Sequence, residues 1–410
     1  MDGLKLLYFH QHFSTPQGSA GTRSYEMARA AIRAGHQVTM VCGSYGVGKT
    51  GLDCPFKYGK RTGVVDDIKV IEFELSYSNG NSFLNRTWLF ICFAFRSTLI
   101  AMTHNYDVVF ATSTPLTAGV PGIFARWLRR KKFVFEVRDL WPELPKAMGV
   151  ISNPIILTMM SLLEWVSYKS AHRLVGLSPG ICAGIISRGI SKSQVSLVPN
   201  GCDLEIFDND SISRAEMPEI SDQDFLAVFT GTHGQANGLD AVLDAASKLK
   251  EFGEEEIKIL LIGAGKLKTD LQYRAKSECL DNVVFKNPVP KDELAKILRR
   301  ADLGIQILAN VPAFYYGTSP NKFFDYLSAG LPVLNNYPGW LAELILKHKC
   351  GYAIEPDNPE LFARTLIDAK NNRPKLKLMG ENAKALAKNN FDRCTLSSEW
   401  IDWVTEGNKS

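Results

Sequence analysis

The sequence of 410 residues lacks the features that mark several classes of protein. Its eight cysteines are scattered and none stand in C-x-x-C spacing, which argues against a zinc site or a disulfide framework. Residues 4–9 form a short apolar run that contains Lys5 and follows no basic segment, so we expect no signal peptide. We therefore predict a reducing, cytoplasmic location. With 45% hydrophobic and 22% charged residues, the composition is typical of a globular protein.

Long hydrophobic runs are also missing, with one near exception at residues 83–102. This segment is apolar nearly all round, but Arg86 and Arg96 interrupt it. A helix that crosses a bilayer needs about 20 mainly apolar residues, and a central arginine costs about 2.5 kcal/mol or more. The segment therefore predicts either a helix that lies in the membrane interface or a helix buried between strands, and the sequence leaves both open.

Acidic residues are scarce in the first half of the chain. Residues 1–200 contain 22 Lys and Arg but 12 Asp and Glu, whereas residues 201–410 contain 25 and 31. The densest basic run lies at residues 126–132, where it either ends a solvated helix or meets an anionic partner. We predict that the basic N-terminal domain associates peripherally with the inner surface of the cytoplasmic membrane, and we expect no nucleic-acid partner.

Apolar runs of strand length alternate with helical patterns along the chain, which predicts an α/β protein with two doubly wound parallel sheets. The alternation breaks once, in a polar, acidic stretch at residues 203–224. We therefore predict a first domain over residues 1–202, a linker over 203–224, a second domain over 225–392 and a last helix within 393–410. The predicted strands are residues 4–9, 37–42, 68–73, 107–111, 133–137, 174–177, 195–198, 225–229, 257–262, 282–285, 303–308 and 331–334.

One formal motif match is rejected. Residues 43–50 satisfy the GxxxxGK[ST] pattern of phosphate-binding loops and follow a predicted strand. A working loop needs a helix that begins at the lysine, here Lys49, because the amides of that helix meet the phosphates. The residues that follow are rich in glycine and include Pro55, so we expect no helix and no nucleotide hydrolysis at this place.

The most informative segment is residues 319–334. Ser319 is a suitable N-cap, Pro320 suits a first helical turn, and Lys322 and Asp325 lie three residues apart on one helix face. Free backbone N–H groups at a helix start favour anions, so a lysine beside them is a natural site for a phosphate. Asp325 is placed to accept hydrogen bonds from sugar hydroxyls. The segment therefore predicts a nucleotide-sugar pocket, although a surface Lys-Asp pair is the simpler alternative.

This segment resembles the donor-site region of the family 4 glycosyltransferases of GT-B architecture, where a P-x-K-x-x-E-Y-x-x-x-G-x-P-V pattern is familiar. Many members carry two glutamates eight positions apart, and Gly317 and Asp325 stand in those places here. The first acidic partner is therefore missing. The residues that carry the resemblance are Pro320, Lys322, Asp325, Tyr326, Gly330, Pro332 and Val333.

Two further loops follow predicted strands. Gly18 and Gly21 precede the first helix, where glycine lets the backbone approach a phosphate or a sugar closely, and they resemble the glycine-rich loop of GT-B enzymes. A flexible turn is the alternative.

In the second domain, Gly231, Thr232 and His233 follow a strand, and Asn237 precedes the next helix. The matching family segment carries two cations that bind the donor pyrophosphate, and Thr232 and Asn237 replace them. The resemblance therefore implies that the phosphates rely on Lys322, backbone amides and His233, which we expect to titrate near neutrality. His233 as a plain loop histidine is the alternative.

Arg138 and Asp139 leave the strand at residues 133–137, within the run EVRDLWPE at residues 136–143. Charged side chains at the end of a buried strand bind a ligand or pair with each other. The run resembles a fucosaminyltransferase-like subgroup of family 4 that adds sugars to bacterial surface glycans. It implies that Arg138 holds a phosphate and that Asp139 orients or deprotonates the acceptor hydroxyl.

The resemblance implies two Rossmann-like domains that face each other across a cleft, with the last helix bracing the first domain. It also implies a retaining transferase that moves a sugar, such as an N-acetylated amino-deoxy sugar, from a UDP-sugar to a lipid-linked glycan, with no cofactor and no metal ion. A sugar-nucleotide epimerase and a non-catalytic binding module are the alternatives. The expected catalytic residues are Arg138, Asp139 and Lys322. The expected donor-binding residues are Gly18, Gly21, Gly231, Thr232, His233, Asn237, Ser319, Pro320, Asn321, Lys322 and Asp325.

Overall fold

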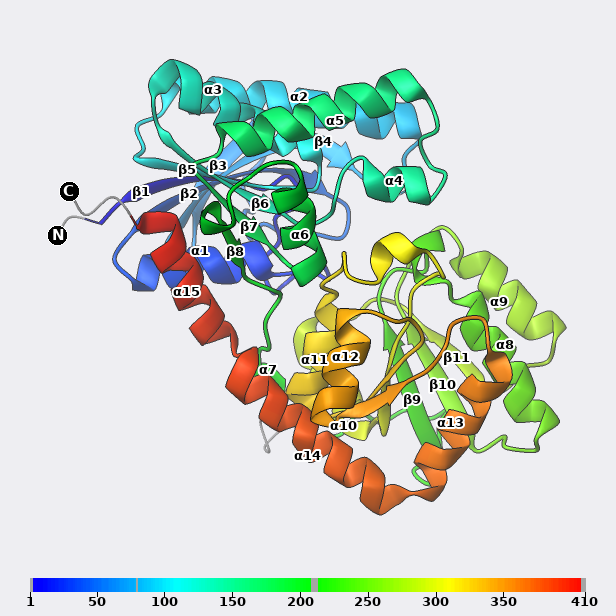
Figure 1. Ribbon diagram of the computed structural model, residues 1–410. Coiled ribbons are helices and arrows are strands. Elements are labelled where there is room, and N and C mark those ends of the chain that lie inside the picture. Colours follow the sequence, from blue (N-terminus) through cyan, green and yellow to red (C-terminus); the bar gives the residue numbers. More distant parts are fainter. Residues whose placement is uncertain (1–2, 79, 208–212, 407–410) are drawn as a thin grey trace. The chain divides into compact units, whose positions relative to one another are not determined.

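The computed structural model describes residues 3–78, 80–207 and 213–406 (Figure 1). The chain divides into two compact units. Unit 1 comprises Met1–Pro199, Gly317–Ser319 and Cys394–Ser410, and unit 2 comprises Asn200–Tyr316 and Pro320–Arg393. Each unit has its own sheet and its own core.

Unit 1 is built on an eight-stranded sheet of order β3-β4-β2-β1-β5-β6-β7-β8. Neighbouring strands are parallel except for β3 and β4, which are antiparallel. The strands are β1 Lys5–Phe9, β2 Gln37–Tyr45, β3 Lys60–Val65, β4 Ile68–Tyr77, β5 Val108–Thr112, β6 Lys132–Val137, β7 Arg173–Gly176 and β8 Val195–Leu197. The helices are α1 Arg23–Arg33, α2 Phe83–Thr103, α3 Val120–Arg129, α4 Glu143–Ala147, α5 Pro154–Ser170, α6 Pro179–Ser187 and α15 Arg393–Thr405.

The order of the strands in unit 1 defines where a ligand is expected. Strand β1 lies between β2 and β5, so the chain builds the sheet first to one side of β1 and then to the other. Ligands of doubly wound sheets bind beyond the carboxyl ends of the strands at such a switch point. All five residues of β5 are buried, as expected for a strand that is covered on both faces.

The helices of unit 1 form a layer on each face of the sheet. Leu7 and Phe9 of β1 belong to a core that includes residues of α2, α3, α5 and α6, whereas Leu6 and Tyr8 belong to a core with α1 and α15. On the α15 side, the ring of Trp400 lies 6.1 Å from the ring of Tyr8. The last helix therefore closes the core of unit 1.

Unit 2 repeats the design with a six-stranded parallel sheet of order β11-β10-β9-β12-β13-β14. Strand β9 lies between β10 and β12, which places the switch point at its carboxyl end. The strands are β9 Phe225–Thr230, β10 Ile257–Ile262, β11 Val283–Lys286, β12 Leu303–Gln306, β13 Val333–Asn335 and β14 Gly351–Ala353. The helices are α7 Leu204–Phe207, α8 Asp240–Glu251, α9 Lys268–Ser277, α10 Lys291–Arg300, α11 Asn321–Ala329, α12 Trp340–His348, α13 Pro359–Asn371 and α14 Arg373–Asn390.

The prediction of two doubly wound α/β domains is confirmed, and each of the predicted strands has a counterpart in the structure. The sequence analysis missed β3, a half-exposed edge strand, and β14, which is three residues long. It placed a linker where α7 forms, and residues 208–212 of that linker and 407–410 of the last segment lie outside the described residues. No helix begins at Lys49, because the next element along the chain is strand β3. The GxxxxGK[ST] match at residues 43–50 therefore lacks the helix that a phosphate-binding loop needs.

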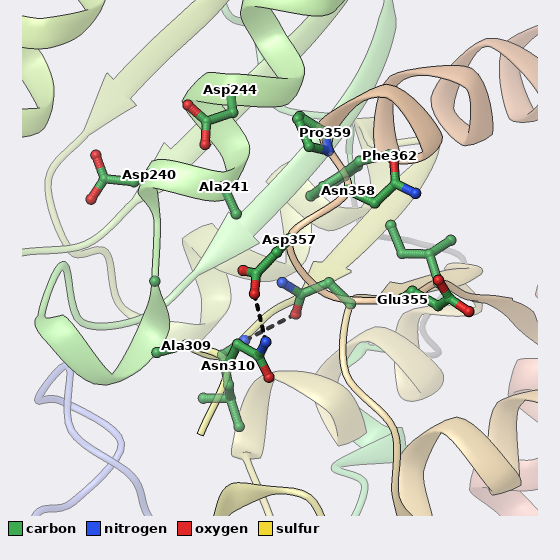
Figure 2. Close-up of a pocket in the computed structure, with 14 residues that line it drawn as sticks. Asp240, Ala241, Asp244, Ala309, Asn310, Glu355, Asp357, Asn358, Pro359 and Phe362 are labelled. Atoms are coloured by element: carbon green, nitrogen blue, oxygen red, sulfur yellow. Dashed lines mark hydrogen bonds between the residues drawn. The ribbon is translucent and has the colours of Figure 1, made fainter. Parts of the chain in front are cut away.

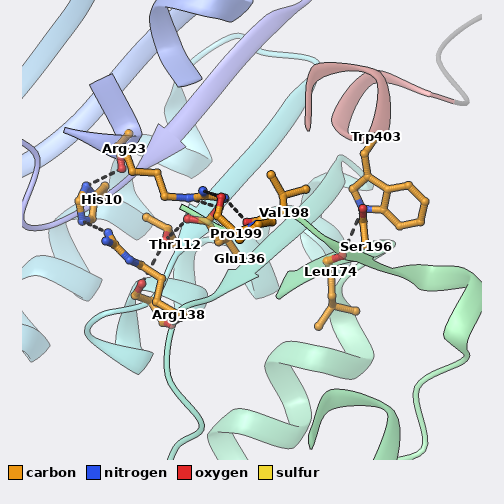
Figure 3. A network of polar contacts seen from close by, with 12 residues as sticks. His10, Arg23, Thr112, Glu136, Arg138, Leu174, Ser196, Val198, Pro199 and Trp403 are labelled. Carbon is orange, nitrogen blue, oxygen red and sulfur yellow. Dashed lines mark hydrogen bonds and ion pairs between the residues drawn. The ribbon is translucent and has the colours of Figure 1, made fainter. Parts of the chain in front are cut away.

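A buried ion pair joins α1 to β6 in unit 1 (Figure 3). The side chains of Arg23 and Glu136 are 0% exposed, and the guanidinium lies 2.8 Å from the carboxylate. Arg23 also donates to the carbonyls of Val198 and Pro199, and Thr112 donates to Glu136. Burial alone would raise the pKa of Glu136, but Arg23, Arg138 and the Thr112 hydrogen bond together more than offset this and hold that pKa below its ordinary value. The pair therefore fixes the strand ends of unit 1.

We expect the substitution Glu136→Gln to destabilise unit 1 by about 3 to 5 kcal/mol, because it leaves the Arg23 guanidinium buried without a counter-ion. Urea unfolding followed by tryptophan fluorescence measures the change. The control is Glu360→Gln in an exposed pair with Arg364, for which we expect a change below about 0.5 kcal/mol. Equal unfolding midpoints for the two variants would contradict the role assigned to the buried pair.

Candidate functional site

The switch point of unit 2 is formed by two tightly packed turns. Gly231 follows β9 with a φ of +144°, and Gly263 follows β10 with a φ of +157°. A side chain on Gly263 would place its Cβ 1.8 Å from the carbonyl oxygen of Gly231, so only glycine fits there. His233 donates its backbone N–H to the carbonyl of Ala264. The first turn was predicted from the sequence and the second was not, although the Gly-x-Gly pattern of the second turn after a strand was a usable signal.

Lys322 lies beside the first turn. Its side chain is buried, its Nζ lies 4.0 Å from the centre of the Phe229 ring, and it donates to Asn237 Oδ1 at 2.9 Å. A side chain on Gly231 would come within 3.2 Å of the Lys322 Nζ, so the absence of a Cβ leaves room for the amine. Burial lowers the pKa of Lys322 to about 7.

The amine of Lys322 has no counter-ion among the described residues, and in this it differs from other buried cations of the chain. Arg23 is paired with Glu136, and Arg393 is paired with Asp203. An uncompensated buried charge is unfavourable, so a site of this kind is completed by an external anion or loses its proton.

Helix α11 begins next to this amine. Its first residue is Asn321, and its N-cap residue Pro320 makes no side-chain cap hydrogen bond. The prediction that Ser319 occupies the N-cap is therefore wrong: Pro320 stands there, and Ser319 belongs to the short segment that groups with unit 1. The start of a helix beside the amine of Lys322 favours an anion.

Asn237 connects the lysine to the turn after β9. Its Oδ1 accepts from Lys322, and its Nδ2 donates to the carbonyl of Thr232 at 2.7 Å. Asn237 therefore positions Lys322 and contributes no charge to the site. The side chain of Thr232 is exposed at the same turn.

His233 differs from its prediction. Its side chain is 0% exposed and lies near the rings of Phe229 and Phe285. Burial, together with the charges of Lys268 and Lys322, lowers the pKa of His233 to about 4, so it is neutral at neutral pH. It does not titrate near neutrality as expected and brings no positive charge to a phosphate. Both ring nitrogens are buried without a hydrogen-bond partner among the described residues.

Asp325 lies one turn further along α11. Its carboxylate is 3.9 Å from Lys291 Nζ, and no described residue donates a hydrogen bond to it. Burial raises the pKa of Asp325 to about 6, with the Lys291 charge opposing the shift. A buried carboxylate with unused lone pairs is suited to accept from hydroxyl groups.

A cavity of about 340 Å³ lies in unit 2 outside this cluster (Figure 2). It is lined by the first turn of α8, the loop after β12 and the loop between β14 and α13. Four carboxylates and no lysine or arginine are among its lining residues, and although Arg274 pairs with two of the carboxylates, this lining disfavours a diphosphate. None of the predicted donor-binding residues is among its lining residues, so we place the anion site at Lys322. The four acidic residues are Asp240, Asp244, Glu355 and Asp357.

The switch point of unit 1 holds a second polar cluster (Figure 3). Arg138 Nη1 lies 3.3 Å from His10 Nε2, and Ser24 Oγ lies 2.8 Å from His10 Nδ1. Because Arg138 donates to Nε2, the imidazole proton lies on Nδ1 and donates to Ser24. Burial, with the charge of Arg138, lowers the pKa of His10 well below its ordinary value, so the ring is neutral. His10 and Ser24 are functional candidates that the sequence analysis missed, although a histidine directly after β1 was a usable signal.

Arg138 and Asp139 do not form an ion pair with each other or with any other described residue. Asp139 accepts from the Thr114 hydroxyl at 3.0 Å, and the Arg138 backbone N–H donates to Ser113. Burial raises the pKa of Asp139, with the Thr114 hydrogen bond and Arg138 opposing the shift. Neither side chain is used up by an ion pair, so both have hydrogen-bonding capacity left for a ligand.

Gly18 and Gly21 are not part of either cluster as described. A Cβ on Gly18 would lie 2.4 Å from Ser14 Oγ and 2.8 Å from the Lys49 nitrogen. Glycine is therefore needed here for packing between two loops of unit 1. Gly21 is exposed just before α1. A role for either in donor binding stays a prediction.

The halves of the chain match two families of sugar-transferring enzymes. Residues 18–201 match the family described as "Glycosyl transferase 4-like domain", and residues 213–386 match "Glycosyl transferases group 1". The fold and these matches define the protein as a glycosyltransferase enzyme with the GT-B fold. The matches support its assignment to family 4, and the fucosaminyltransferase-like subgroup stays a prediction.

Three similar proteins illustrate the range of this resemblance. The probable glycosyltransferase WbjE of Pseudomonas aeruginosa is 24% identical over 72% of this chain and 74% of its own length. The structure of HepE from Anabaena in complex with UDP has a TM-score of 0.66 and 17% identity, over 97% of this chain and 99% of HepE. The structure of WaaG, a glycosyltransferase involved in lipopolysaccharide biosynthesis, has a TM-score of 0.68 and 16% identity, over 98% of this chain and 100% of WaaG.

We expect UDP binding to be coupled to the proton on Lys322. Because the pKa of this amine is about 7 without a ligand, a bound diphosphate must raise that pKa, and binding takes up a proton above neutrality. The affinity for UDP should therefore fall as the pH rises from about 7 to 9, by up to about tenfold per pH unit. Titration calorimetry in two buffers of different ionisation enthalpy measures the uptake.

The control for this pH dependence is Lys322→Met, which removes the titrating group. We expect the variant to bind UDP weakly and with no proton uptake from this position. The same uptake in the variant and in the unmodified protein would exclude Lys322 as the coupled group.

Proposed function

We propose that the protein transfers a sugar from a UDP-sugar to a lipid-linked glycan at the inner face of the cytoplasmic membrane, in the synthesis of a surface polysaccharide. The observation that carries the donor side is the buried amine of Lys322, which has no counter-ion among the described residues and lies beside the start of α11. The names of the similar proteins support the remainder, because HepE binds UDP and WaaG acts in lipopolysaccharide biosynthesis.

On the donor side, the diphosphate lies against Lys322, the first N–H groups of α11 and the turn at Gly231. The N–H groups and the amine supply positive potential without a metal ion. Asp325 accepts from the hydroxyls of the ribose, since its carboxylate has free lone pairs. Thr232, Pro320 and Asn321 lie at the same turns, and Ser319 adjoins them in sequence.

On the acceptor side, the proposed residues are Arg138 and Asp139. Arg138 binds a phosphate of the lipid-linked acceptor, and His10 positions its guanidinium. Asp139 orients the acceptor hydroxyl by accepting a hydrogen bond from it. Thr114 positions Asp139 through the hydrogen bond to its carboxylate.

In the proposed reaction, the bond between the anomeric carbon and the phosphate oxygen breaks, and the acceptor oxygen bonds to the same carbon on the same face. The acceptor proton passes to the departing phosphate, so the reaction needs no separate base on the opposite face. Negative charge grows on the leaving UDP, where Lys322 and the start of α11 stabilise it. The fixed positions of these groups lower the barrier because they need no reorganisation.

The two alternatives are not favoured. An epimerase or a binding module does not need the transferase domains that both halves of the chain match. Gly317 stands where many family members carry an acidic residue, which changes how the transferred sugar is held.

The decisive assay measures UDP release from a panel of UDP-sugars with and without a lipid-linked acceptor. We expect release that requires both a matching donor and the acceptor. Interconversion of the sugar without acceptor would indicate an epimerase, and binding without turnover on every donor tested would indicate a binding module.

The substitution Lys322→Ala removes a charge-assisted hydrogen bond to the diphosphate, which is worth about 2 to 3 kcal/mol. We expect kcat/KM to fall by about 30-fold to more than 100-fold, as measured in the same assay. The control is Lys248→Ala on α8, where the amine pairs with Glu251 at the surface. Unchanged turnover in Lys322→Ala would contradict the donor site proposed here.

A further inference from the structure

Three helices of unit 1 carry large apolar side chains on their outer faces. Helices α2, α3 and α5 pack side by side over one face of the sheet (Figure 1). Twelve large apolar side chains on them are between 43% and 78% exposed, and we name this set the apolar face. It consists of Leu84, Trp88, Ile91, Phe95, Leu99, Phe124, Trp127, Leu128, Ile155, Met159, Leu162 and Trp165.

Helix α5 buries polar side chains and exposes apolar ones, which is the reverse of an ordinary surface helix. On α5 the buried residues include Glu164, Ser167 and Ser170, whereas Met159 and Leu162 are exposed. On α2 the exposed apolar side chains recur at positions 84, 88, 91, 95 and 99, which is one stripe of a helix. A contiguous apolar surface of this kind marks a binding site for a partner or a membrane.

Basic residues outnumber acidic residues on these helices. The sole acidic residue of α2, α3 and α5 is Glu164, which is buried. Arg96, which interrupts the apolar run of α2, donates to the Gly59 carbonyl and lies 4.3 Å from the Phe73 ring. It therefore turns away from the apolar face. The basic run at residues 126–132 begins in α3 and continues past its end.

We propose that the apolar face docks into the interfacial layer of a bilayer that contains anionic phospholipids, with the basic run at residues 126–132 at the headgroups. Apolar stripes bind the acyl boundary, cations bind anionic headgroups, and tryptophans such as Trp88 and Trp165 favour the interface between the two. A two-fold dimer through the same face would bring two copies of the basic run near each other, which the charge disfavours.

This inference selects between the two alternatives that the sequence left open for residues 83–102. Within the described residues, no helix has the length and the apolar composition needed to cross a bilayer. Helix α2 instead buries Phe93, Ala94 and Ala101 against the sheet and presents its other stripe outward. The inference rests on the proposed function in one respect: an enzyme that acts on a lipid-linked acceptor must reach the membrane surface.

Vesicle flotation of the full chain tests the docking surface. Vesicles contain phosphatidylcholine with about 30% phosphatidylglycerol. We expect the unmodified protein to float with them and the combined variant Trp88→Ser, Phe95→Ser, Leu162→Ser to partition about tenfold less or weaker still, because three inserted side chains are lost. The matched control is Tyr273→Ser, Leu346→Ser, Leu378→Ser, which removes three apolar side chains of similar exposure from unit 2 and should float normally. Equal flotation of the two variants would overturn the proposal.

The salt dependence of vesicle binding distinguishes insertion of apolar side chains from electrostatic adsorption to the headgroups. Electrostatic contacts are largely screened at about 0.5 M NaCl, whereas apolar insertion is not. We expect binding of the unmodified protein to persist at high salt, and the variant Arg130→Gln, Lys131→Gln, Lys132→Gln to bind less at low salt only. Complete release of the unmodified protein at high salt would overturn insertion by the apolar face.

Tryptophan quenching tests the same surface without any substitution. Trp88, Trp127 and Trp165 are exposed on the apolar face, whereas Trp340 and Trp400 are buried. Brominated lipids should quench fluorescence of the unmodified protein, and absence of quenching would overturn insertion. A lipid-free dimer that the Trp88→Ser, Phe95→Ser, Leu162→Ser variant dissociates would assign the face to a second copy and overturn the proposal as well.

Turnover with a short, water-soluble acceptor distinguishes this inference from the proposed function. We expect the apolar-face variant to keep that turnover while it loses flotation. If the unmodified protein showed no turnover with any acceptor, the proposed function would be refuted. The flotation experiment would still test membrane docking independently.

Discussion

The constraint on which both units depend is that their central strands are buried on both faces. Every residue of β5 and of β9 is buried, and both strands are apolar except at their last positions, Thr112 and Thr230. Polar and charged side chains gather where the strands end, and the switch points collect them from several segments of each unit. His10 and Arg138 meet at one such place, and Lys322 and Asn237 meet at the other.

Charge pairing separates the side chains that hold the structure from those that are available to a ligand. Arg23 and Arg393 are buried, and each is compensated by a carboxylate, Glu136 in unit 1 and Asp203 in unit 2, so their charges stabilise the unit to which they belong. Lys322 is also buried but lacks a carboxylate partner among the described residues, and burial lowers its pKa to about 7. Burying a charge costs desolvation free energy. Where a carboxylate compensates the buried charge, the pair is structural, and where no carboxylate does so, the charge marks a candidate anion site.

The sequence was sufficient to predict most strands, because a strand that is buried on both faces of a sheet is a continuous apolar run. It was insufficient for β3, an edge strand with a mixed pattern, and for the cap of α11, where Ser319 was expected and Pro320 stands. The roles of His10 and Ser24 were missed because each is one polar residue among many in the sequence. His233 was expected to titrate near neutrality, but only the fold shows that it is enclosed beside Lys268 and Lys322.

The sequence by itself determined the two α/β domains, the position of the lysine at a helix start and the excess of cations in the first half, because these follow from local pattern and composition. Tertiary structure alone decided which charges are compensated and which faces of α2, α3 and α5 remain exposed. Both depend on residues far apart in the chain: Glu136 reaches Arg23 across 113 positions, and Asn237 reaches Lys322 across 85. Desolvation and pairing act between neighbours in space, which the order of residues does not specify.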